Sequence, residues 1–358
     1  MTHEFKKILE VYIKSKQAGL KAVLATVVAV DGSSYRGAGV RMLVLEGNQT
    51  VGAISGGCVE KEVVHQTQTV FATGTAKIMT YDGRFRLGCE GTLYVLLEPF
   101  ALQQENILQL QKSIQQRKTF EISSYYSLSI KSIGMGSVLK LENGICFSFS
   151  NNSFNGNIPI DFYSEKPNRS VFKQSVPPCF QLILIGVEHD AKSLCVMASH
   201  MGWEVTIIGG PNSQKEAIDF PGHTIFLRTT AEELVIDSMD AQTAVVLMNH
   251  NFAKDLLFLK ALKECKAIYI GLLGATKRKE QLLSAFIEYH MDVELEFLDK
   301  IYGPAGLDIG SETPEEIAVS IISEILVITR KRNAFHLQER KGALHDRAPT
   351  IPIEKNEK

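Results

Sequence analysis

A thiol stands directly behind two glycines in residues 55–60, which read Ser-Gly-Gly-Cys-Val-Glu. Glycines let a backbone turn through positive φ and let another molecule approach the main chain closely, and a turn rich in N–H groups favours a thiolate. These residue types predict a bound ligand or a reactive sulfur at Cys58. A turn in which Cys58 is a small buried hydrophobe is the alternative, and composition alone does not separate the two.

Two other segments in this part of the chain carry similar groups. Residues 31–41 form a loop rich in glycine, serine and arginine, and residues 88–91 place Cys89 in a second glycine-flanked turn. The six cysteines form no C-x-x-C pair, and the spacing of Cys58, His65 and Cys89 does not support a metal site. We therefore expect reduced thiols and no bound metal.

The turn at residues 55–60 needs a strand before it and a helix after it. Apolar residues predict that strand at 50–54, and helical spacing predicts the helix at 61–72. A strand that turns through glycine into a helix is typical of anion binding. The other elements expected nearby are a helix at about residues 5–16 and strands at 21–30, 42–45, 76–81 and 92–98.

Beyond Pro177 and Pro178 the pattern alternates between strand and helix, which predicts a parallel, doubly wound sheet. The predicted fold class is α/β: a mixed α+β N-terminal domain followed by a Rossmann-like, doubly wound parallel sheet. Strands are expected at 181–185, 204–208, 243–248 and 267–271, and helices at 190–201 and from the capping residue Thr313 to about 330. The predicted domains are 1–99, an intervening subdomain and linker at 100–176, the Rossmann-like domain at 177–332 and a mobile charged tail at 333–358.

The first turn of the predicted parallel sheet argues against a dinucleotide. Residues 186–191 read Gly-Val-Glu-His-Asp-Ala and keep only the first glycine of G-x-G-x-x-G. Glu188 stands where the backbone should meet the pyrophosphate, and its carboxylate would repel phosphate. We therefore expect the Rossmann-like fold without NAD(P).

Another turn of the same sheet is better suited to anions. Gly271 and Gly274 end a strand, and a helix start carrying Lys277 and Arg278 follows, so a phosphate could dock there; a solvated basic helix start is the alternative. His250 closes another strand at the same carboxyl edge and could donate to a ligand, although a lone histidine is more often structural.

Composition sets further limits. The 358 residues suit two domains, and a net charge of −2 argues against nucleic acid as the principal partner. The first residues lack the features of a signal peptide, and no apolar run is long enough for a membrane span. The cytoplasm is the expected location.

Four blocks of the sequence together resemble the XdhC/CoxI family of xanthine dehydrogenase accessory factors. They are residues 32–41, 55–60, 269–274 and 303–318, in the order the family shows. The resemblance implies a maturation factor that binds the molybdenum cofactor (molybdopterin), assists its sulfuration and inserts it into a molybdenum hydroxylase. The partners it implies are an apo-enzyme of the xanthine dehydrogenase type, a cysteine desulfurase and a second copy in a homodimer.

The resemblance also implies a cofactor site in which the loop at 31–41 lies beside the turn at 55–60, with Cys89 nearby. Turn chemistry explains the glycine-rich loop at 303–310 almost as well as a ligand does. The candidate cofactor-binding residues are Ser33, Ser34, Arg36, Arg41, Ser55, Gly56, Gly57, Cys58, Cys89, His250, Gly271, Gly274, Lys277, Arg278, Gly306 and Asp308.

Two other functions stay open at this point. One is an NAD(P)-dependent oxidoreductase, against which Glu188 argues, and the other is a sulfur-relay protein that carries a persulfide on Cys58 or Cys89. No nucleophile–base–acid triad is visible, so we expect a cofactor chaperone more than a turnover enzyme.

Overall fold

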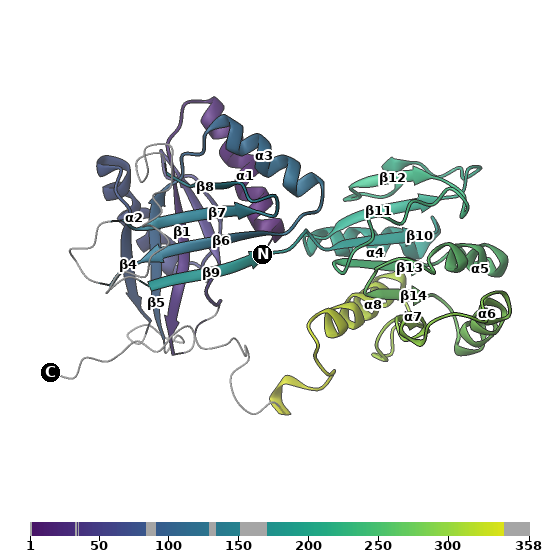
Figure 1. Ribbon diagram of the computed structural model, residues 1–358. Coiled ribbons are helices and arrows are strands. Elements are labelled where there is room, and N and C mark those ends of the chain that lie inside the picture. Colours follow the sequence, from purple (N-terminus) through teal and green to yellow (C-terminus); the bar gives the residue numbers. More distant parts are fainter. Residues whose placement is uncertain are drawn as a thin grey trace. The chain divides into compact units, whose positions relative to one another are not determined.

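The computed structural model describes residues 2–32, 34, 36–83, 91–128, 134–150 and 170–339 (Figure 1). The chain divides into two compact units that meet in sequence between Pro178 and Cys179. The domain boundaries expected at residues 99 and 332 stay predictions, and the tail beyond residue 339 lies outside the described residues. Within the described part, none of the helices combines the length and apolar character that a membrane span needs.

The first sheet of unit 1 has five antiparallel strands in the order β3-β2-β1-β5-β4. Alternate residues of β1, such as Val23 and Ala25, face one way and pack against Val59 and Val63 of α2. The elements are α1 (Thr2–Gln17), β1 (Ala22–Asp31), β2 (Arg41–Leu45), β3 (Thr50–Gly52), α2 (Cys58–Thr73), β4 (Lys77–Asp82) and β5 (Thr92–Pro99).

A second sheet covers the other face of the first one. Leu24 of β1 belongs to a core that also contains Ile8 of α1, Ile122 of β6 and Leu139 of β7, so residues after 100 share a core with the N-terminal helix. The strands lie in the order β8-β7-β6-β9 and pair antiparallel. The elements are α3 (Gln104–Gln115), β6 (Phe120–Tyr126), β7 (Gly136–Leu141), β8 (Cys146–Ser148) and β9 (Ser170–Val176).

Unit 2 contains the predicted parallel sheet, with six strands in the order β12-β11-β10-β13-β14-β15. Helices α4 and α8 pack on one face and α5 and α6 on the other (Figure 1). The strands are β10 (Gln181–Ile185), β11 (Glu204–Gly209), β12 (Ile225–Arg228), β13 (Thr243–Leu247), β14 (Tyr269–Leu272) and β15 (Ile301–Tyr302). The helices are α4 (His189–His200), α5 (Phe252–Ala261), α6 (Thr276–Tyr289), α7 (Leu295–Leu298), α8 (Pro314–Thr329) and the short 3-10 turns η2 (Ala217–Asp219) and η3 (Leu337–Glu339).

The strand order of unit 2 is that of the Rossmann fold, so the prediction of a doubly wound sheet is confirmed. From β10 the following strands add to one side of the sheet, and from β13 they add to the other side. Ligands of such sheets bind in the crevice at the carboxyl ends of these two strands. The predicted cap of α8 is also confirmed: the Thr313 hydroxyl accepts a hydrogen bond from the N–H of Glu316, whose carboxylate reaches back to Thr313.

Gly186, at the end of β10, is a glycine because β13 passes too close for a side chain. Its φ is 138°, and a Cβ there would lie 2.4 Å from the carbonyl oxygen of Met248. We expect Gly186→Ala to lower the free energy of unfolding by about 2 kcal/mol or more. Urea unfolding checks this, with Gly210→Ala as control, because a Cβ at Gly210 meets nothing within 4 Å; an equal, small effect of both changes would contradict it.

Candidate functional site

The turn between β3 and α2 is built around the carboxylate of Glu60. Its Oε1 accepts hydrogen bonds from the N–H groups of Ile54 (3.0 Å) and Ser55 (2.6 Å). Its Oε2 accepts from the Ser55 hydroxyl (3.0 Å) and the Gly57 N–H (2.8 Å). Burial alone would raise the pKa of Glu60, but the hydrogen bonds from Ser55 and Gly57 outweigh it and lower the pKa. The turn therefore encloses a charged carboxylate.

Gly57 fixes where α2 begins. It is the residue before the helix, with a left-handed φ of 118°, and Glu60 closes the capping arrangement three residues later. The helix consequently starts at Cys58, whereas the apolar spacing predicted a start at residue 61; that boundary was wrong because the cap is set by glycine and glutamate rather than by the apolar pattern. The position of the Cys58 side chain lies outside the described structure.

The backbone of this turn is open to a ligand. The N–H group of Gly56 donates to no described acceptor. A Cβ on Gly56 or Gly57 would meet no described atom within 4 Å, and both glycines are exposed. Gly56 is required neither by a left-handed φ nor by a close neighbour, so the described fold gives no reason for its lack of a side chain.

Arg36 ties the preceding loop to this turn. One guanidinium nitrogen donates to the carbonyl of Ala53 at 2.7 Å, and another pairs with the Glu4 carboxylate at 2.6 Å. Ser34 donates to the Arg36 carbonyl at 2.7 Å. The structure thus brings together the candidates Ser34, Arg36, Ser55, Gly56, Gly57 and the backbone of Cys58 on one side of unit 1. Ser33 and Cys89 lie outside the described residues.

Arg41 lies elsewhere, inside unit 1 between the two sheets, with 7% of its surface exposed. Its guanidinium donates to the Gly39 carbonyl at 3.1 Å and to the side-chain oxygen of Gln174, and it lies over the Phe5 ring. Burial lowers the pKa of Arg41 to about 10, opposed by the charge of Glu98. A cofactor contact for Arg41 stays a prediction.

Glu98 is a buried acidic residue whose charge interacts with that of Arg41. Its carboxylate is completely buried and accepts hydrogen bonds from the N–H (2.7 Å) and the hydroxyl (2.6 Å) of Ser137. Burial raises the pKa of Glu98 to about 7, although the Ser137 bonds and Arg41 oppose the rise. Unit 1 therefore holds a titratable carboxyl in its core.

In unit 2, a buried aspartate organises the carboxyl edge of the sheet. Asp255 is 2% exposed; it pairs with Arg278 at 2.7 Å and accepts from the Asn249 amide at 2.8 Å. Gly274 has a φ of 121°, and a Cβ there would meet the Arg278 stem at 2.7 Å. Next to Asn249, His250 has a left-handed φ of 52° and its Nε2 lies 3.4 Å from Asp190 of α4. His250, Gly274 and Arg278 are thus held at the carboxyl edge of β13 and β14.

Four other candidates in unit 2 have different surroundings. Gly271 is buried, and a Cβ there would lie 2.8 Å from the Tyr269 ring, so this glycine makes room for a tyrosine. The Gly306 N–H donates to Glu324 at 2.9 Å, which also accepts from the Tyr269 hydroxyl. Lys277 and Asp308 are exposed. The fold itself explains the two glycines, and ligand binding at all four positions stays a prediction.

The cysteines with described side chains are ordinary thiols. Cys146, Cys179, Cys195 and Cys265 are in the thiol form, and all but Cys146 are buried. Burial raises the pKa of Cys195 to about 11 and also raises that of Cys265. Among the described residues there is no group of three side chains arranged to hold a metal ion.

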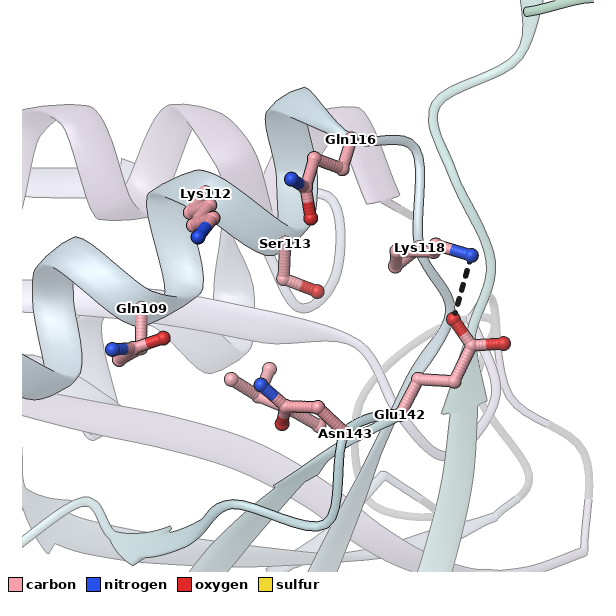
Figure 2. A pocket seen from close by; sticks show the side chains of 8 residues that line it. Gln109, Lys112, Ser113, Gln116, Lys118, Glu142 and Asn143 are labelled. Atoms are coloured by element: carbon pink, nitrogen blue, oxygen red, sulfur yellow. Dashed lines mark ion pairs between the residues drawn. The ribbon is translucent and has the colours of Figure 1, made fainter. Parts of the chain in front are cut away.

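A shallow, polar pocket of about 180 Å³ lies between α3 and the hairpin of β7 and β8 (Figure 2). Ser113 and Asn143 line it, and Lys118 pairs with Glu142 at its rim at 3.2 Å. None of the predicted site residues belongs to it.

Three supporting residues were not identified as such from the sequence. Glu60 is the last residue of the motif at 55–60, and its position three residues after Gly57 is the local signal of a helix cap. Glu4 pairs with Arg36, 32 residues away in the sequence, and Asp255 pairs with Arg278, 23 residues away. No local pattern reveals pairs so far apart in the chain.

The fold and the two sites define a protein with an α+β unit that presents an open glycine–cysteine turn, followed by a Rossmann-like unit. Family models agree with this division: the XdhC and CoxI family matches residues 15–82, and the XdhC Rossmann domain matches residues 182–325. The two matches together cover more than half of the chain. The chain belongs to the XdhC/CoxI family.

Several relatives match over nearly the full length. One of them, a probable xanthine dehydrogenase component from Bacillus subtilis (strain 168), is 29% identical over 338 residues, which cover 88% of this chain and 94% of the relative. The molybdenum cofactor insertion chaperone PaoD of Escherichia coli (strain K12) is 22% identical, with 91% of this chain and 89% of PaoD covered. A crystal structure of a xanthine dehydrogenase from Bacillus halodurans superposes with a TM-score of 0.72 at 26% identity, covering 91% of this chain and 96% of that one.

The buried carboxyl of Glu98 predicts a pH dependence of stability. The folded protein keeps this proton up to about pH 7, whereas the unfolded chain loses it near the ordinary value of 4.5. The free energy of unfolding therefore falls as the pH rises through this window and levels off above it. Urea unfolding at about pH 5 and about pH 8 should show a smaller fall for Glu98→Gln than for wild type. The exposed Glu121→Gln is the control, and an unchanged slope in Glu98→Gln would contradict the expectation.

The pair between Asp255 and Arg278 predicts a stability effect in unit 2. Asp255→Ala leaves Arg278 and the Asn249 amide without their shared acceptor, so we expect a loss of about 3 kcal/mol. Asp292→Ala serves as control, because Asp292 pairs with Lys263 while 79% exposed, so that solvent screens the pair and its loss should change stability far less. Equal effects of the two variants in chemical denaturation would show that Asp255 does not organise this edge.

Proposed function

We propose that this protein is a maturation factor that binds the molybdenum cofactor and assists its insertion into a molybdenum hydroxylase of the xanthine dehydrogenase type. Membership of the XdhC/CoxI family supports this, as do the names of the two relatives, one a probable component of xanthine dehydrogenase and the other a molybdenum cofactor insertion chaperone. The observation that carries the proposal in this chain is the open turn at Gly56 and Gly57, beside Arg36.

The groups at this turn suit such a cargo. The cofactor offers a polar pterin, a dithiolene, an oxo-metal centre and a phosphate. The N–H group of Gly56, which has no described acceptor, can donate to a pterin or oxo oxygen, and the lack of side chains at Gly56 and Gly57 lets the ring system approach the backbone. Arg36 shapes this surface by holding the Ala53 carbonyl, and the thiol of Cys58 is a soft ligand at the first position of a helix.

We further propose a source for the cofactor's sulfur and an assembly state. A cysteine desulfurase would supply the terminal sulfur while the cofactor is bound, and the protein would act as a homodimer in the cytoplasm. Arg278 and His250, at the carboxyl edge of the unit 2 sheet, would form a separate ligand-binding surface of unit 2.

Purification from a molybdenum-replete host tests the proposal. We expect molybdenum and pterin fluorescence to elute with the wild-type protein in anaerobic gel filtration. Arg36→Ala should retain roughly tenfold less cofactor, because the turn loses the charge-assisted hydrogen bond from Arg36 to the Ala53 carbonyl. Glu4→Gln is the matched control: it removes the partner carboxylate but leaves Arg36 on Ala53, and it should keep most of the cofactor. Thermal unfolding verifies that both variants are folded. Persistent absence of pterin and molybdenum from the wild-type protein would overturn the proposal.

A further inference from the structure

The inner surface of the turn is an anion-binding concavity that is already occupied. The N–H groups of Ile54, Ser55 and Gly57 and the Ser55 hydroxyl converge on one point, as they do around bound phosphate or sulfate in other proteins. The group at that point is the carboxylate of Glu60. Both of its oxygens have two donors each, at distances between 2.6 and 3.0 Å.

We propose that Glu60 is a built-in anion, which holds this concavity in shape and keeps external oxyanions out of it. The proposal deepens the proposed function, on which its reference to the cofactor rests: the turn would bind the neutral pterin or the oxo-metal part of the ligand, and other residues would bind its phosphate. Glu60 thereby acts as a positioning and specificity-determining residue.

Charge and donor count support this assignment. An incoming oxyanion would have to displace a carboxylate that has four hydrogen bonds, or lie within a few ångströms of it in a partly buried site, where like charges repel strongly. The donor that stays available, the N–H group of Gly56, belongs to an exposed glycine. One isolated N–H group next to a fixed negative charge suits a neutral acceptor better than a phosphate dianion.

A helix cap without this role would behave differently. If Glu60 only stabilised the start of α2, its removal would cost about 1 kcal/mol of stability and create nothing new. If Glu60 is a resident anion, its removal leaves an empty concavity of converging donors. A small carboxylate added to the solution should then fill that concavity.

The test is an acetate titration of Glu60→Ala followed by the amide chemical shifts of Ile54, Ser55 and Gly57. We expect saturable shifts of these three amides in Glu60→Ala, and none in wild type or in Glu62→Ala, which removes a carboxylate from the same helix two residues further on. A folded Glu60→Ala that shows no saturable response would overturn the inference.

A titration of the wild-type protein with inorganic phosphate completes the test, and it does not depend on any variant being folded. Unchanged shifts of Ser55 and Gly57 support the inference, and saturable shifts would overturn it. Neither titration involves the cofactor. A cofactor-free wild-type preparation would therefore count against the proposed function alone, and a failed acetate titration against this inference alone.

Discussion

Backbone donors before a helix need acceptors, and one carboxylate accepts from three of the N–H groups in the turn between β3 and α2. Through the bonds of Glu60 to Ile54, Ser55 and Gly57, the first turn of the helix is tied to the segment that follows the strand and to the residue that caps the helix. The packing of Val59 and Val63 against β1 follows from that start. A lowered pKa keeps the acceptor charged at neutral pH, so the connection does not depend on small changes of pH.

The same side of unit 1 also depends on its N-terminal helix. Glu4 of α1 pairs with Arg36, and α1 is fixed by Phe5, Ile8 and Leu9, which are almost completely buried. The apolar core therefore sets the direction of a charged side chain at the surface. Inside that core, Arg41 and Glu98 place a guanidinium and a carboxyl group between the two sheets, where burial makes the charged form of each less favourable.

The sequence contained enough to predict the parallel sheet, since β10, β11 and β13 are short, mostly apolar runs separated in part by helical patterns. It also located the glycine–cysteine turn, because two adjacent glycines between a strand pattern and a helix pattern indicate a turn. It did not reveal that Gly271 makes room for Tyr269 or that Gly306 donates to Glu324, since both reasons lie in three-dimensional neighbours. The contact between Glu4 and Arg36 was hidden for the same reason.

The burial of Cys179, Cys195 and Cys265 has a consequence for how labile sulfur would travel in this protein. Exchange of sulfur between partners begins with a thiolate, and the raised pKa values of Cys195 and Cys265 keep these groups protonated. A persulfide brought to the surface would find no competing nucleophile at these two interior positions. The fold of unit 2 thus keeps Cys195 and Cys265 out of reach of any labile sulfur at the surface.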